Sequence, residues 1–252
     1  MNTLVLISAD SEWRAVEEIL SPKDVQSTPL GETFNIRLSS GTSLTGIEST
    51  GKGDNEFPDP SIRFFHGGWG KVSAAATTQY VLDHWQPDLL VNLGTCGGFA
   101  GRIERGTIIL VEKTILYDII EQMSDPDEAI THYSTELDLA WVDNGLWGIE
   151  NGKPSIVRGL LVSADRDIVA GDIPGLIEKY GAVAADWESG AIAWVAKKNE
   201  VRCLILRGVT DLVSTDGGEA YGNIEIFHEN TKKVMKGLIE QLPGWLKTSS
   251  AS

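Results

Sequence analysis

Short apolar runs alternate with helical repeats along the chain. The first run, residues 4–7, is partly β-branched and is followed at once by polar residues, which predicts a buried strand. Apolar residues then recur three and four positions apart between 13 and 20, behind a cap-like Asp10 or Ser11, which predicts a helix. Further strands are expected around the apolar runs 89–91, 107–111, 160–162 and 203–206, and helices over 71–85, from about 188, and over about 227–242.

This alternation predicts an α/β fold, a single domain over residues 1–252 with three α/β/α layers and a central mixed, mostly parallel twisted sheet. Residues 28–65 are punctuated by Gly, Ser and Asp, so a few strands joined by turns are expected there, with an exposed loop at 54–60. A stretch at about 122–153, which includes Trp141 and Trp147, lacks a clear period and is interpreted as a variable excursion from the domain.

The composition and charge of the chain exclude several classes of binding partner from what is expected. The chain has 36 acidic and 21 basic side chains, a formal net charge of −15, and no window that gathers Lys and Arg. Nucleic acid and anionic membrane surfaces are therefore not expected partners. No segment reads as a secretion signal or a membrane span, and the two cysteines, Cys96 and Cys203, have neither disulfide-framework nor metal spacing, so a cytoplasmic location is expected. The four histidines show no ligand spacing, so no metal site is predicted.

Candidate chemistry lies directly after the apolar runs, because open α/β sheets bind ligands beyond the carboxyl ends of their strands. The segment Gly94-Thr95-Cys96-Gly97-Gly98 allows the backbone to approach a ligand closely, although a tight turn without a ligand explains it equally well. Glu188 precedes a helix of small residues, where a carboxylate either binds a ligand hydroxyl or interacts with the helix dipole. Asp211 follows the last apolar run and is either functional or a turn cap.

The order of these motifs resembles the nucleoside phosphorylase superfamily, in particular its methylthioadenosine/S-adenosylhomocysteine nucleosidase branch. The resemblance covers most of the chain. It rests on five motifs in order: a strand with a Glu-bearing loop (Ser8 to Glu12), Gly-x-Gly-Lys-Val-x-Ala-Ala (Gly68 to Ala75), Asn-x-Gly-Thr-x-Gly-Gly (Asn92 to Gly98), a Trp-Glu-Ser-Gly-Ala helix start (Trp187 to Ala191) and Arg-x-x-Thr-Asp (Arg207 to Asp211).

The resemblance implies cleavage of the N-glycosidic bond of a purine nucleoside without metal or organic cofactor. Asp211 would be the general acid that protonates or hydrogen-bonds the base at N7, and Glu12 would orient and deprotonate the attacking water. Glu188 would accept hydrogen bonds from the ribose 2′ and 3′ hydroxyls. The implied substrate contacts are Thr95, Cys96, Gly97, Asp167, Ile168 and Trp187. Family members form dimers or rings of dimers, and a homodimer is expected.

Water is favoured over phosphate as the nucleophile. Phosphorylases of this type carry Gly-Asp-Pro and a nearby Arg after the first strand, whereas this loop reads Ala9-Asp10-Ser11-Glu12-Trp13-Arg14. A carboxylate at that place repels phosphate. Arg14 and Arg158 keep a phosphate-dependent phosphorylase as the alternative, and a non-catalytic nucleoside-binding protein on the same fold is a second alternative.

Two departures from the family pattern bear on the substrate. Trp187 stands where a methionine usually packs under the ribose, and Asp167 replaces the aromatic residue that packs on the base in adenine nucleosidases. Base stacking at this place is then lost, and a carboxylate there either hydrogen-bonds an exocyclic amine or a base N–H, or faces solvent. The stretch at 122–153 is expected to shape the 5′ side of the pocket. The base and the 5′ substituent stay open.

Overall fold

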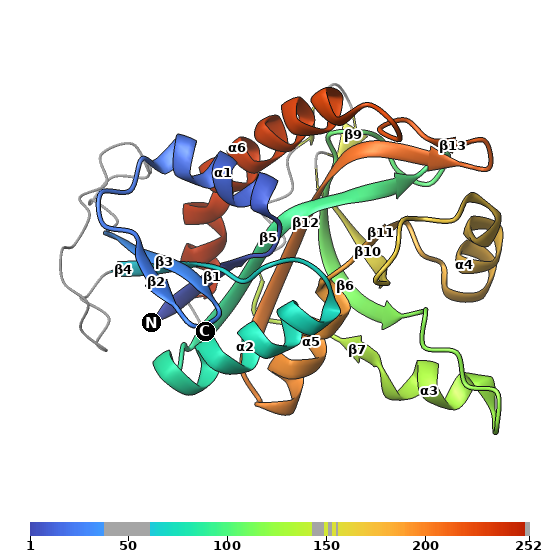
Figure 1. Ribbon diagram of the computed structural model, residues 1–252, viewed down its shortest axis with the longest axis horizontal. Helices are drawn as coiled ribbons and strands as arrows, with labels where there is room; N and C mark the ends of the chain where they lie inside the picture. Colours follow the sequence, from blue (N-terminus) through green and yellow to red (C-terminus); the bar gives the residue numbers. More distant parts are fainter. Residues whose placement is uncertain (38–60, 143–148, 151–152, 155, 250–252) are drawn as a thin grey trace.

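The computed structural model describes residues 1–37, 61–142, 149–150, 153–154 and 156–249 (Figure 1). Its main sheet contains 11 strands, most of them in the order β13-β12-β6-β10-β11-β5-β1-β4-β3-β2, with β7 paired to β6. The strands are β1 (Thr3–Ile7), β2 (Gln26–Thr28), β3 (Gly31–Arg37), β4 (Ser61–His66), β5 (Leu89–Phe99), β6 (Ile108–Leu116), β7 (Ser134–Glu136), β10 (Ile156–Ser163), β11 (Ala184–Asp186), β12 (Arg202–Ser214) and β13 (Gly217–Gly218).

The predicted α/β fold with a mixed sheet is confirmed. Pairing is parallel from β4 through β1 and β5 to β12, and again among β6, β10 and β11. The antiparallel part of the sheet consists of the β2-β3-β4 meander and the pairings β5–β11, β6–β12, β6–β7 and β12–β13. Two-residue strands β8 (Ile149–Glu150) and β9 (Lys153–Pro154) form a separate hairpin.

Helices cover both faces of the sheet. In Figure 1, α1 (Asp10–Leu20) and α6 (Ile224–Ser249) lie on one side of the strands, and α2 (Lys71–Trp85) and α5 (Ser189–Lys198) lie on the other. Trp13 of α1 and Met235 of α6 join one buried cluster, and Val81 of α2 and Ile192 of α5 join a second. The shorter helices are α3 (Pro126–His132), α4 (Ile173–Tyr180) and the 3-10 turn η2 (Ala170–Asp172).

Five of the strands close into a ring, which the alternation of strands and helices does not predict. Strand β5 pairs with β11 and with β12, β12 pairs with β6, β6 with β10, and β10 with β11. The long strands β5 and β12 run side by side over almost their whole length, so their ends leave the flat part of the sheet together (Figure 1). The carboxyl ends of β5 and β12 and the short strand β11 therefore meet at one mouth of the ring.

Several predicted boundaries are shifted. The helix predicted over 71–85 has these bounds, whereas the C-terminal helix starts at Ile224 and continues through Pro243 to Ser249, beyond the predicted 227–242. The loop predicted at 54–60 and Trp147 lie outside the described residues. Trp141 does not shape the cavity described below: its indole N–H donates to the Asp138 carbonyl at 2.9 Å and its ring packs against the core. No helix among the described residues is long and apolar enough to span a membrane.

Candidate active site

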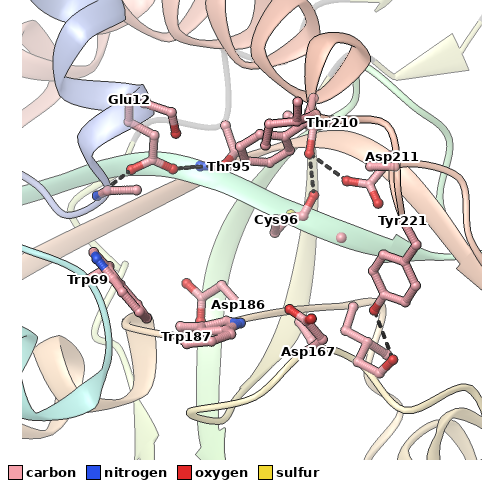
Figure 2. Close-up of a pocket in the computed structure, with 18 of the residues that line it drawn as sticks. Glu12, Trp69, Thr95, Cys96, Asp167, Asp186, Trp187, Thr210, Asp211 and Tyr221 are labelled. Carbon is pink, nitrogen blue, oxygen red and sulfur yellow. Dashed lines mark hydrogen bonds between the residues drawn. The ribbon is translucent and has the colours of Figure 1, made fainter.

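A cavity of about 1040 Å³ opens at the mouth of the strand ring (Figure 2). Strands β5, β11 and β12 line it, together with the start of α1, the start of α6 and the segment after β10. All nine residues predicted from the sequence line this cavity: Glu12, Thr95, Cys96, Gly97, Asp167, Ile168, Trp187, Glu188 and Asp211. They come from segments that are up to 199 positions apart in the chain, so the fold brings them together.

Glu12 is held by the backbone of two elements. It is the third residue of α1, and its Oε2 accepts a hydrogen bond from the backbone N–H of Ala9, the N-cap, at 3.3 Å. Its Oε1 accepts from the N–H of Thr95 at 2.6 Å and from the Thr95 hydroxyl at 2.8 Å. The side chain is only 5% exposed, so its direction is fixed before any ligand binds. Figure 2 shows the carboxylate above the cavity, beside β5.

Arg207 lies at the centre of the buried charges. Its guanidinium donates from Nε to Asp186 and from Nη2 to Asn92, both at 2.7 Å. Within the described residues, its Nη1 is buried and makes no hydrogen bond. Both this atom and Glu12 Oε1 crowd residue 94: a Cβ there would lie 2.3 Å from Nη1 and 2.9 Å from Oε1. Glycine is therefore required at 94, and a third N–H of Arg207 is directed toward the region of Glu12.

Asp186 was not among the predicted site residues, yet it anchors this arrangement. It accepts hydrogen bonds from the hydroxyl of Ser163 at 2.5 Å and from the hydroxyl and backbone N–H of Ser189, in addition to Arg207. A buried carboxylate needs such partners, and here they are supplied in full by the protein. Two features of the sequence could have indicated this role: Asp186 precedes a helix of small residues, and Arg207 is a charged residue within an apolar strand. Below, Glu12, Asp186, Glu188 and Arg207 are called the Arg207 cluster.

Glu188 completes the cluster. It is the N-cap of α5, and its Oε1 accepts the backbone N–H of Gly70 at 2.9 Å. Gly70 has φ 87° and ψ 158°, a conformation open only to glycine, and this aims its N–H at the carboxylate. Burial, with added repulsion from Asp186 and Glu12, raises the pKa of Glu188 to about 8, against the opposing effects of Arg207 and of the Gly70 hydrogen bond. Glu188 therefore holds a proton at neutral pH in the free protein.

Asp211 lies on the opposite side of the cavity, near the end of β12. Its Oδ1 accepts a hydrogen bond from the Thr210 hydroxyl at 2.8 Å, which itself also donates toward the carbonyl of Cys96 (Figure 2). Burial is the main cause that raises the pKa of Asp211, and the Thr210 hydrogen bond opposes it. A raised pKa in a cavity is typical of a carboxyl group that delivers a proton.

Tyr221 and Asp167 form the wall next to Asp211. The phenol of Tyr221 donates to the carbonyl of Ile168 at 2.9 Å. Burial, then the charges of Asp167 and Asp211, raises the pKa of Tyr221, so both carboxylates act on the same hydroxyl. Asp167 is exposed, and among the described residues it forms neither a hydrogen bond nor an ion pair. Asp167, Asp211 and Tyr221 are called the Tyr221 wall.

Trp69 and Trp187 form the floor of the cavity in Figure 2. Their ring centroids lie 5.3 Å apart at an interplanar angle of 60°, an edge-to-face pair. Trp69 is 58% exposed, and it was not predicted as a site residue although it lies in a Gly-rich segment. The cavity also includes Tyr221 and Phe227, which were not predicted as site residues. They lie before and within the first turns of α6, which begins at Ile224 and not at the predicted position of about 227.

The two arginines that favour the phosphorylase alternative, Arg14 and Arg158, differ in their position relative to the cavity. Arg14 lines the cavity and donates to the carbonyl of Asp10 at 3.3 Å. Arg158 is exposed, does not line the cavity and precedes the end of β10 by five residues, so it cannot meet a ligand there. The described part of the chain contains no group of three or more His, Cys, Asp or Glu side chains arranged to hold a metal ion.

Comparison with known proteins identifies the family. The family model described as "Phosphorylase superfamily" matches residues 60–242. The chain belongs to the phosphorylase superfamily. The matched region begins at β4 and ends within α6, so it includes the whole strand ring and the cavity residues from Trp69 onward.

Relatives within the superfamily point to one branch. A 5′-methylthioadenosine/S-adenosylhomocysteine nucleosidase of Buchnera aphidicola is 25% identical over 193 residues, which cover 74% of this chain and 83% of that protein. The apo 5′-methylthioadenosine nucleosidase of Arabidopsis thaliana has a TM-score of 0.72 at 20% identity, over 100% of this chain and 96% of that one. The Helicobacter pylori nucleosidase bound to butyl-thio-DADMe-Immucillin-A has a TM-score of 0.72 at 15% identity, over 97% and 99% of the two chains.

Proposed function

We propose that the chain hydrolyses the N-glycosidic bond of a purine nucleoside of the methylthioadenosine/S-adenosylhomocysteine type or a related one, and releases the free base and the ribose moiety. The observation that carries this proposal is the meeting of Glu12, Glu188 and Asp211 in one cavity of a phosphorylase-superfamily fold. The names of the Buchnera and Arabidopsis relatives support the same reaction.

Asp211 is proposed as the general acid. A purine leaves poorly as an anion, so a proton supplied to the base, at N7, lowers the barrier to breaking the bond to C1′. The carboxyl group must be protonated when the nucleoside binds. Its raised pKa, caused by burial, extends the protonated form toward neutral pH.

Glu12 is proposed as the group that orients and deprotonates the attacking water. Its two oxygens are already fixed by Thr95 and Ala9, so the direction in which it accepts a further hydrogen bond is set. A water that donates to this carboxylate is oriented in advance, and the carboxylate can take its proton as the bond to C1′ forms.

Glu188 and Trp187 are proposed to bind the ribose. The free oxygen of Glu188 faces the cavity next to the hydrogen bond from Gly70, where the 2′ and 3′ hydroxyls can reach it. As the bond to the base breaks, positive charge grows on the sugar, and the neighbouring carboxylates stabilise it more than the neutral ground state. Trp187 supplies an apolar surface below the sugar, and Thr95, Cys96 and Gly97 supply strand backbone above it.

Charge favours water over phosphate as the nucleophile. Six acidic side chains line the cavity (Asp10, Glu12, Asp167, Asp186, Glu188 and Asp211) against two guanidinium groups, those of Arg14 and Arg166. Arg166 pairs with Asp172, and the buried Arg207 behind the cavity wall pairs with Asp186. Arg14, which donates to the Asp10 carbonyl, is the observation that favours a phosphorylase. A dianionic nucleophile would meet more repulsion than attraction here.

Base release from a nucleoside panel tests the proposal. The protein is incubated in phosphate-free buffer with methylthioadenosine, S-adenosylhomocysteine, adenosine, inosine and guanosine, and free base is measured. We expect base release with at least one of them, unchanged when phosphate is added, and no ribose 1-phosphate. Strict dependence on phosphate would indicate a phosphorylase instead, and thermal stabilisation by a nucleoside without turnover would indicate a binding protein.

We also propose a homodimer in the cytoplasm as the working state, because family members of this type assemble from dimers and the chain has no disulfide framework. Sedimentation of the purified protein measures the mass directly, and a monomer at micromolar concentration would contradict the dimer.

A further inference from the structure

Behind the cavity wall, three segments of the chain meet around Lys71, the first residue of α2. Its ammonium group donates to Asp118, which follows β6, and lies 3.9 Å from Oδ2 of Asp165, which follows β10. Asp118 in turn accepts the backbone N–H of Asp165 at 3.0 Å. The side chains of Lys71 and Asp118 are each 17% exposed, so their attraction is less screened than that of a surface pair. These three residues are called the Lys71 network.

The network caps α2 from outside. The first N–H groups of a helix lack partners and carry partial positive charge. The N-cap of α2 is Gly70, which has no side chain, and its first turn contains no acid. Asp165 Oδ1 fills this role, because it accepts the backbone N–H of Lys71 at 2.6 Å. The ammonium of the same residue offsets the repulsion between Asp165 and Asp118.

The same network borders the cavity on two sides. Gly70, the residue before Lys71, donates its N–H to Glu188, and a Cβ at Gly70 would lie 3.2 Å from Asp165 Oδ1. After Asp165 the chain continues into Asp167 and Ile168, which line the cavity next to Tyr221. The network thus connects the segment that holds Glu188 with the segment that carries Asp167.

We propose that Lys71 is a positioning residue of this cavity: by holding Asp118 and Asp165 at the start of α2, it aims the Gly70 N–H at Glu188 and thereby sets how Glu188 binds the ribose hydroxyls. The inference rests on the proposed function. Without the ammonium group, the two carboxylates repel, Asp165 leaves the Lys71 N–H, and Gly70 loses its fixed orientation. Glu188 then keeps its burial but loses its backbone donor.

Two properties of Glu188 then change together. Its hold on the ribose weakens, and its pKa rises further above about 8, because the Gly70 hydrogen bond is one of the effects that lower it. The other charged groups that act on Glu188, namely Asp186, Glu12 and Arg207, are untouched by the substitution.

The test compares Lys71→Met and Asp165→Ala, which removes the acceptor of the Lys71 N–H directly, with the parent on a ribonucleoside that it cleaves and on the 3′-deoxy form. We expect KM for the ribonucleoside to rise about tenfold, as for the loss of one hydrogen bond, with kcat within about threefold. The preference for ribose over 3′-deoxyribose should shrink by the same factor, and the pH dependence of KM should move to higher pH. Lys233→Met, which breaks an exposed pair with Glu229 on α6, is the control and should change none of these.

Unchanged KM in a folded Lys71→Met protein, or equal losses on both substrates, would overturn the proposal, since a purely structural role affects both alike. If Lys71→Met fails to fold by circular dichroism, Asp165→Ala decides. Absence of base release by the parent would overturn the proposed hydrolysis alone, and the ratio of the two Kd values, followed by tryptophan fluorescence, would then decide the role of Lys71. Failure of the parent to bind either nucleoside would overturn both.

Discussion

The two sides of the cavity differ in how completely the protein satisfies their charged groups. The Arg207 cluster is buried: Arg207 is 1% exposed and Glu12 5%, and Asp186 receives all its hydrogen bonds from neighbouring side chains and backbone. The Tyr221 wall is more open at two of its three residues: Tyr221 is 49% exposed and Asp167 is exposed, whereas Asp211 is 7% exposed and, within the described residues, accepts one hydrogen bond, from the Thr210 hydroxyl.

This difference separates two tasks. A field that must act on a growing charge is strongest when its dipoles and charges are fixed beforehand in a water-poor site, which describes the Arg207 cluster. A surface that selects a ligand presents polar groups that can still bind, and on the Tyr221 wall the exposed Asp167 is such a group. Each side also contains one of the two departures from the family pattern: Trp187 precedes Glu188 of the Arg207 cluster, and Asp167 belongs to the Tyr221 wall.

The largest expected effect is on the open side. Asp211→Asn removes the proton but keeps the shape, so kcat should fall by about a thousandfold or more, as for loss of a general acid. Nucleoside binding should persist, measured by fluorescence titration beside base release. Asp216→Asn, at the exposed turn after β12, is the control. Near-native turnover of Asp211→Asn would show that Asp211 is not the general acid, and the Tyr221 wall would then have no catalytic role.

Arg207→Met tests the buried side. The substitution leaves Asp186 with an unpaired charge beside Glu12 and Glu188, so the free energy of unfolding at pH 7 should fall by about 3–5 kcal/mol. Urea unfolding measures it. Arg105→Met breaks an exposed pair with Glu219 and should cost less than about 1 kcal/mol. Similar losses in both variants would mean that burial does not distinguish the two kinds of pair.

A pH series on Glu188→Gln sharpens the contrast. In the parent, the folded state holds a proton on Glu188 up to about pH 8, while the unfolded chain releases it near 4.5, so this group makes stability fall as pH rises between these values. Glutamine does not titrate. The thermal midpoint of the variant minus that of the parent should therefore increase from pH 5 to pH 8.5. A difference that does not change with pH would contradict the raised pKa of Glu188.

The smallest effect is expected for Asp167→Phe, which restores the aromatic residue typical of adenine nucleosidases. Stacking on the base contributes about 0.5–1.5 kcal/mol, so KM for an adenine nucleoside should fall by about two- to tenfold with kcat little changed. Asp167→Leu, which lacks a ring, is the matched control. A rise in KM would show instead that the Asp167 carboxylate hydrogen-bonds the base.

Helices and strands were predicted well where glycine or proline marks their ends in the sequence. The helix over 71–85 lies between a Gly-rich segment and Pro87, and both ends could be read from these residues. The places of Glu12, Thr95 and Asp211 shortly after apolar runs singled them out, and the motif order then suggested their roles.

What the sequence could not supply depends on contacts between distant residues. Ring closure requires β5 to pair with both β11 and β12, and nothing near residue 97 indicates this. The role of Asp186 depends on Arg207, which is 21 positions away, and that of Lys71 on residues 47 and 94 positions away. Each of these residues alone resembles an ordinary helix-end or surface charge.

The pairing of β12 with β5 contains one irregularity, and it sets the spacing between the two sides of the cavity. Val209 pairs with Cys96 while Asp211 pairs with Gly97, so Thr210 is an extra residue in β12. In a regular strand residues 207 and 211 would point to the same face, and one inserted residue reverses the alternation beyond it. The direction of the Asp211 side chain therefore depends on the number of residues in this part of β12 as well as on their identity. A deletion of Val209 would keep Arg207, Thr210 and Asp211 and still reverse the face of β12 on which the Asp211 carboxyl group lies.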